Sequence, residues 1–174
     1  MSSRRRALSA LAVVAAACSG AKKAEPPVGF TAPSSDEASV AFQIYSIDER
    51  PITSQTVRGK PTVMAFATTG GIKGQAQLNF LVIMAKHDEG KNNYVFVALE
   101  PRDNRQLVEE YKRFLGITFP IGMADDEMLQ GLGPFGDVRA EPTTIILDRQ
   151  GRVVFRAQDR VVKADELRAT LGGL

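Results

Sequence analysis

A chain of 174 residues with an apolar share of 44% suits one globular domain. It contains no tryptophan and few other aromatic residues, which argues against a surface on which nucleic-acid bases stack. Of its 22 basic residues, three stand together at Arg4–Arg6, and the other 19 are nearly balanced in number by 20 acidic residues. The composition lacks the basic footprint of a nucleic-acid-binding protein, so no nucleic-acid partner is expected.

The first 17 residues have the three parts of an export signal. Arg4–Arg6 form a basic region, Ala7–Val14 form an apolar region, and Ala15–Ala17 supply small residues before a cleavage point. The apolar region is shorter than the roughly 20 residues that a membrane span requires. Residues 1–17 are therefore predicted to be a removable signal peptide.

The cysteine that follows this leader resembles the lipobox cysteine of bacterial lipoproteins. In that family the cysteine is acylated and the leader is cut before it; the usual leucine three positions earlier is Ala15 here. The resemblance implies a lipid on Cys18, a membrane partner through that lipid, and a location in the cell envelope facing the periplasm. A plain secretory leader with an incidental cysteine is the alternative. Residues 18–39, rich in Ala, Pro, Ser, Lys and Glu, read as a flexible tether.

From residue 40 the pattern alternates between strands and helices. Runs rich in β-branched and apolar residues predict strands, and longer apolar periodicities predict helices. The strands are expected at residues 40–47, 62–68, 94–99, 119–123, 143–147 and 152–155, and the helices at 75–89, 104–115, 125–132 and 164–171. This order predicts one α/β domain over residues 40–174, a central mixed β-sheet with helices on both faces.

Several local signals refine the helices. Asp103 followed by Gln106 predicts a capping box, and Gly116 suits a left-handed helix end. The acidic run Asp125–Glu127 suits the first turn of a helix, and capping is a better reading of it than a cation site. Residues 79–85 are apolar on nearly every side, which predicts burial on more than one face and leaves a partner-contact face as the alternative.

Three strings resemble the thioredoxin-like TlpA and AhpC/TSA (redoxin) families. Residues 59–68 match the segment that leads into the family's active site, which has the form GKP, then an apolar strand, then AT. Residues 116–120 match GITFP, and residues 141–153 resemble VPTTFLIDRDGRIV. The match runs from about residue 40 to the end of the chain and implies a thioredoxin-like fold.

The resemblance also implies a cis-proline at Pro142. In these families that proline faces the active-site loop and leaves an extended backbone edge open to a peptide. The corresponding edge here is Ala140, Glu141, Pro142 and Thr143. A trans proline that begins a strand is the alternative.

The family's redox loop follows the strand as ATWCPPC and opens a helix with RAE. This chain has Thr69, Gly70, Gly71, Ile72, Lys73 and Gly74 there, then Gln75-Ala76-Gln77. Alignment from the helix side places Gly71 and Gly74 at the two cysteines, with one residue inserted, and alignment from the strand side places Gly70 and Lys73 there. Neither register supplies a cysteine, and the one cysteine of the chain is Cys18.

Thiol–disulfide exchange needs an attacking thiolate and a resolving thiol, and peroxide reduction needs a cysteine that becomes a sulfenic acid. The sequence therefore predicts no catalytic residue, no cofactor and a redox-inactive binding module for an envelope protein or peptide. The alternative is thiol–disulfide oxidoreductase or peroxiredoxin-type activity, which would need a free Cys18. The lone His87 lacks partners for a metal site, and the glycine loop lacks the spacing of a phosphate-binding loop.

Overall fold

The computed structural model describes residues 38–174; the predicted leader, Cys18 and the tether up to residue 37 lie outside them. The strands are β1 (Gln43–Ser46), β2 (Ile52–Thr53), β3 (Thr62–Ala67), β4 (Asn93–Ala98), β5 (Ile121–Met123), β6 (Thr143–Leu147) and β7 (Val153–Ala157). The helices are α1 (Ile72–His87), the 3-10 turn η1 (Arg102–Asn104), α2 (Arg105–Leu115), α3 (Asp126–Leu129) and α4 (Ala164–Leu171).

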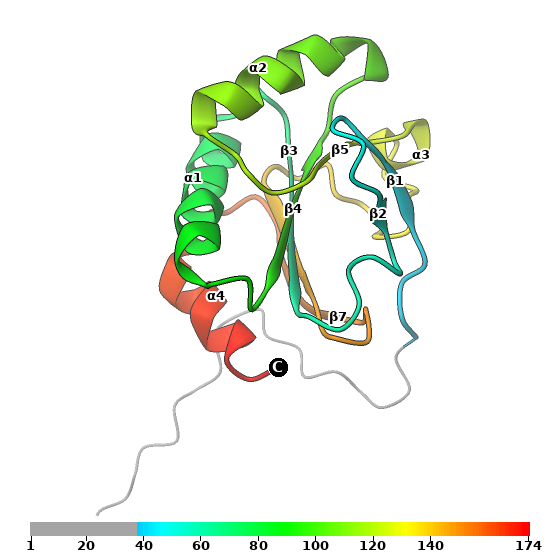
Figure 1. Cartoon of the computed structure of the whole chain (residues 1–174). Coiled ribbons are helices and arrows are strands. Elements are labelled where there is room, and N and C mark those ends of the chain that lie inside the picture. Colours follow the sequence, from blue (N-terminus) through cyan, green and yellow to red (C-terminus); the bar gives the residue numbers. More distant parts are fainter. Residues whose placement is uncertain (1–37) are drawn as a thin grey trace, which may run out of the picture.

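The seven strands form one mixed sheet in the order β2-β1-β5-β4-β3-β6-β7. The central strands β3, β4 and β5 run parallel, and β6 and β7 form an antiparallel hairpin beside β3. Helices α1 and α4 lie on one side of the sheet and the short α3 lies on the other (Figure 1). The predicted fold class is confirmed, because the sheet is mixed and helices cover both of its faces.

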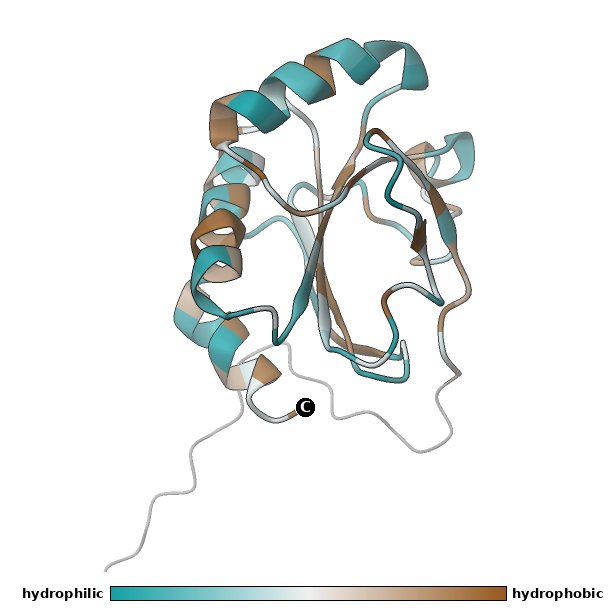
Figure 2. Cartoon of the chain, viewed as in Figure 1, coloured by the Kyte–Doolittle hydropathy of each residue, from teal (hydrophilic) through white to brown (hydrophobic). Residues whose placement is uncertain are grey.

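Two apolar cores fill the spaces between these layers. One packs Leu78 of α1, Val108 of α2 and Leu167 of α4 against the sheet, and the other packs Met128 and Phe135 against its opposite face. Apolar residues concentrate along the central strands, whereas most residues of α2 are hydrophilic (Figure 2). The carboxyl ends of β3, β4 and β5 therefore meet at a rigid edge, where loops carry the candidate site.

Most predicted elements are present, but several details were wrong. Strand β2 was not predicted, since two residues are too short a run to show alternation. The Asp103 capping box is absent because Asn104 is the N-cap of α2 and makes no side-chain cap. Helix α3 ends at Leu129, and Gly131 has a left-handed φ of 80°. The left-handed Gly116 at the end of α2 and the Asp125 side-chain cap on Met128 N–H are confirmed.

Helix α1 is less buried than its apolar sequence predicts. Leu78, Leu81 and Val82 face the core, but Ile83 is 51% exposed, and Ile72 in the first turn is 85% exposed. Burial on more than one face is therefore only partly confirmed.

Asp48 ties the turn after β1 to α2. It accepts hydrogen bonds from Ser46 Oγ at 3.0 Å and Lys112 Nζ at 3.0 Å, and it pairs with Arg50. Partial burial raises the pKa of Asp48, but these donors outweigh it and hold the pKa well below its ordinary value. The ion pair therefore stabilises the fold above the unfolded-state pKa of about 3.9, and this contribution is lost as the pH falls below that value.

We expect Asp48→Asn to lower the free energy of unfolding by about 1 kcal/mol at pH 7 and by less at pH 3. Urea unfolding at several pH values measures this difference. Asp103→Asn, a change at an exposed carboxylate in η1, is the matched control. An equal loss at both pH values would contradict the assigned ion pair.

Candidate functional site

The loop that follows β3 is held by two carboxylates from distant parts of the chain. Thr68 donates its N–H and its hydroxyl to Glu141 Oε1, at 2.8 and 2.9 Å. Thr69 donates the same two groups to Glu100 Oε1, at 2.9 and 2.8 Å. Partial burial raises the pKa of Glu100, but the Thr69 backbone and side-chain hydrogen bonds, with Asn104 Nδ2, lower it below its ordinary value. The loop is therefore fixed at its base.

The Glu141–Pro142 peptide bond is cis, as the family resemblance implied. Pro142 and Thr143 are buried, and Thr143 already pairs with Phe66 in the sheet. Ala140 is exposed and Glu141 is half-buried. The accessible part of the predicted edge is therefore its first half, Ala140 and Glu141.

The Glu141 carboxylate lies against the two glycines that replace cysteines in one of the two alignments. A Cβ atom added at Gly71 would stand 2.0 Å from Glu141 Oε1, and one added at Gly74 would stand 2.8 Å from the same atom. Gly71 is the N-cap of α1 and Gly74 lies in its first turn. The carboxylate thus occupies space that side chains at both positions would need.

The other alignment places its two positions away from this carboxylate. A Cβ atom at Gly70 would meet nothing within 4 Å, and Lys73 Nζ reaches outward to Asp159 Oδ1 at 2.7 Å. Gly71 and Gly74 are the pair that faces the Pro142 edge, which favours the alignment from the helix side.

Gly74 also lies tightly against the sheet, and this close packing predicts how Gly74→Ala changes the stability of the protein. A Cβ atom there would stand 2.7 Å from Ala67 Cβ. Alanine ordinarily stabilises a helix interior by about 1 kcal/mol relative to glycine. We expect Gly74→Ala to reverse that sign and to destabilise the protein by about 1–3 kcal/mol through overpacking, measured by urea unfolding.

Gly71→Ala is the matched control for this substitution. The three atoms nearest its added methyl group all belong to the Glu141 carboxylate, which is the end of a side chain and can shift, whereas Ala67 beside Gly74 is fixed in β3. A Gly74→Ala protein at least as stable as the Gly71→Ala protein would contradict the close packing of α1 on β3.

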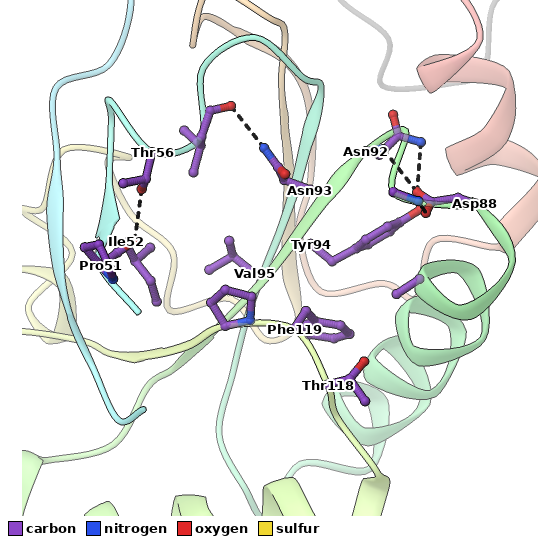
Figure 3. A pocket seen from close by; sticks show the side chains of 14 residues that line it. Pro51, Ile52, Thr56, Asp88, Asn92, Asn93, Tyr94, Val95, Thr118 and Phe119 are labelled. Atoms are coloured by element: carbon purple, nitrogen blue, oxygen red, sulfur yellow. Dashed lines mark hydrogen bonds between the residues drawn. The ribbon is translucent and has the colours of Figure 1, made fainter. Parts of the chain in front are cut away.

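Two hollows lie at opposite ends of β4. A hollow of about 180 Å³ adjoins the site and is lined by Thr68, Leu99, Leu129, Arg139 and Glu141. A hollow of about 310 Å³ lies at the opposite end of β4, where Asn93 Nδ2 donates to Val57 O and Asn92 donates to Asp88 (Figure 3). Burial, with Asp88, raises the pKa of Tyr94 in that second hollow. The first hollow is the one that shares Thr68 and Glu141 with the loop and the Pro142 edge, and the second lies away from both.

The remaining sequence candidates lie outside this site. His87 is exposed in the last turn of α1, and Asp125 caps α3. Among residues 38–174, no group of three or more His, Cys, Asp or Glu side chains is arranged to hold a metal ion. No helix in that range is both long and apolar enough to cross a membrane.

Solved structures share this fold at low sequence identity. A DsbF homologue from Corynebacterium diphtheriae has a TM-score of 0.70 at 17% identity, covering 87% of this chain and 97% of its own. The chain has a thioredoxin-like fold. The exposed lipoprotein thioredoxin Etrx1 from Streptococcus pneumoniae has a TM-score of 0.62 at 18% identity over 77% of this chain and 99% of its own.

A third thioredoxin-like relative by structure is StoA from Bacillus subtilis, with a TM-score of 0.61 at 20% identity over 75% of this chain and 95% of its own. No family model matches the sequence, and no curated protein does. At these identities the likeness shows the thioredoxin-like fold and leaves the chemistry to the residues of the site.

Proposed function

We propose that this chain is an exported, lipid-anchored binding module that holds an extended segment of an envelope protein and carries out no thiol–disulfide exchange. The observation that carries the proposal is the Glu141 carboxylate in the space that side chains at Gly71 and Gly74 would need. The one cysteine of the chain, Cys18, directly follows the predicted signal peptide and is the proposed lipid attachment point. The thioredoxin-like fold then presents a binding edge and no reactive sulfur.

The backbone around the cis-proline supports binding of an extended segment. Among residues 38–174, the N–H and C=O groups of Glu141 make no backbone hydrogen bond, so they can pair with an added strand. Ile72, which follows Gly71, is a large apolar side chain with 85% of its surface exposed. A backbone edge beside an exposed apolar side chain is a combination that peptide-binding surfaces use.

The names of structural neighbours support an exported location. One is a secreted disulfide oxidoreductase from Mycobacterium tuberculosis, and another is the exposed lipoprotein thioredoxin. The predicted signal peptide and Cys18 agree with that setting. The alternative, oxidoreductase activity as these names indicate for the neighbours, requires a free thiol at Cys18.

Photo-crosslinking in whole cells tests the binding edge. A photoreactive amino acid at Ile72 is expected to give a discrete adduct that Ala140→Tyr removes and Ala169→Tyr leaves intact. Both alanines are exposed, but Ala169 lies on α4, away from the edge. An adduct unaffected by Ala140→Tyr would move the binding site elsewhere.

Mass spectrometry of the mature N-terminus tests the anchor and the alternative activity together. We expect Cys18 to be acylated. We also expect the rate of insulin reduction with the purified full chain to be no higher than the rate without the protein. A free Cys18 thiol with measurable insulin reduction would favour the oxidoreductase.

A further inference from the structure

The hollow of about 180 Å³ beside the Pro142 edge is lined by both apolar and charged side chains. Two leucines, Leu99 and Leu129, and three polar side chains, Thr68, Arg139 and Glu141, line it. Binding pockets for drug-sized ligands run to about 300–1,000 Å³, so this hollow suits one long side chain instead.

The Glu141 carboxylate makes no ion pair within the described part of the chain. There it accepts hydrogen bonds only from Thr68, a neutral residue. Arg139 lines the same hollow but is committed to Asp137, with its Nη2 2.8 Å from Asp137 Oδ2. Burial, and then the charge of Glu141, raise the pKa of Tyr111 to about 12.

A half-buried carboxylate gains most from a cation that arrives as water leaves. The Lys and Arg side chains combine an aliphatic stem with a charged end, and such stems pack against apolar surface while the charge stays at a polar group. The lining of this hollow offers both kinds of contact, leucine side chains for the stem and the Glu141 carboxylate for the charge.

We infer that the bound segment places a basic side chain, Lys or Arg, in this hollow, with its stem between Leu99 and Leu129 and its charge on Glu141. The inference rests on the proposed function, since it names the partner chemistry of the same edge. Glu141 is thereby a specificity-determining residue, and its carboxylate replaces sulfur chemistry with charge recognition at the cis-proline.

Selection of a random peptide library on the immobilised full chain tests this assignment. Three further proteins are used in parallel: Glu141→Gln, Ala140→Tyr and Ala169→Tyr. We expect enriched peptides to carry Lys or Arg at one fixed position and to bind Glu141→Gln about tenfold or more weakly, with a smaller difference at high salt. Thermal unfolding of each variant separates weak binding from loss of the fold.

The outcomes separate this inference from the proposed function. Peptides that Ala140→Tyr rejects, that Ala169→Tyr retains and that lose affinity on Glu141→Gln support both. Peptides that Ala140→Tyr rejects but that show no basic position, or that bind Glu141→Gln equally well, overturn the charge assignment alone. The absence of any peptide sensitive to Ala140→Tyr overturns both.

Discussion

Replacement of Gln77 by leucine is expected to be among the most destabilising single changes in this domain. Gln77 lies in α1 with no exposed surface, and its side-chain amide bridges the backbone of Val162, 85 residues further along the chain. Val162 N–H donates to Gln77 Oε1 at 2.6 Å, and Gln77 Nε2 donates to Val162 O at 3.3 Å. Leucine has a similar size but would leave both backbone groups buried without a partner.

The expected loss is about 2–6 kcal/mol, because an unpaired buried polar group costs about 1–3 kcal/mol and two are created here. Urea unfolding followed by circular dichroism measures it as a lower midpoint with an unchanged m-value. Gln106→Leu is the matched control, since Gln106 is exposed on α2 and is expected to change stability by less than about 0.5 kcal/mol. Equal stability of the two variants would contradict the bridge to Val162.

The sequence is most informative where local pattern and packing agree. The β-branched run Thr143–Leu147 and the helix Ala164–Leu171 were predicted with the bounds that the structure has. The turn between β6 and β7 is also local, since Gly151 adopts the left-handed φ of 82° that its place between these two strands requires. The alternation of strands and helices predicted a mixed sheet, and the structure adds which strands pair in parallel, β3 with β4 and β4 with β5.

The start of α1 was predicted less well, because its first turn contains a glycine. The helix begins at Ile72 and not at Gln75, although Gly74 has a low intrinsic preference for helix. Packing explains the difference, since Ala67 and Glu141 leave no room for a side chain at that position. A glycine that signals a loop in the sequence is here a close-packing residue.

The role of Glu141 depends on contacts that local patterns do not contain. Its hydrogen bonds reach Thr68, 73 residues earlier in the chain. One signal was nevertheless present: the family string has valine before the proline, where this chain has glutamate. A charge at a position that borders the loop indicates that the chemistry of the loop has changed, and the matching glycines at 71 and 74 indicate where the carboxylate lies.

A cysteine introduced at position 71 tests whether the Glu141 carboxylate opposes thiol chemistry at this site. A thiol placed by Gly71→Cys would stand at the N-cap of α1, a position that ordinarily lowers a cysteine pKa. Glu141 Oε1 would lie beside it, and a neighbouring negative charge raises a thiol pKa. In a Cys18→Ser background the introduced cysteine is the only one in the chain. We expect Gly71→Cys to react slowly with iodoacetamide at pH 7.

Adding Glu141→Gln removes the charge and keeps the size of the side chain. The thiol is then expected to react about tenfold faster at pH 7, the change that a pKa lower by about one unit produces. The rate measured against pH gives both pKa values. Gly71→Cys with Glu100→Gln is the control, because Glu100 bonds to Thr69 and the three atoms nearest the new Cβ all belong to Glu141. Equal rates with and without Glu141 would show that its charge does not reach the N-cap. A large difference would mean that cysteines alone cannot restore thiol chemistry here, because the glutamate at the cis-proline opposes the thiolate on which that chemistry depends.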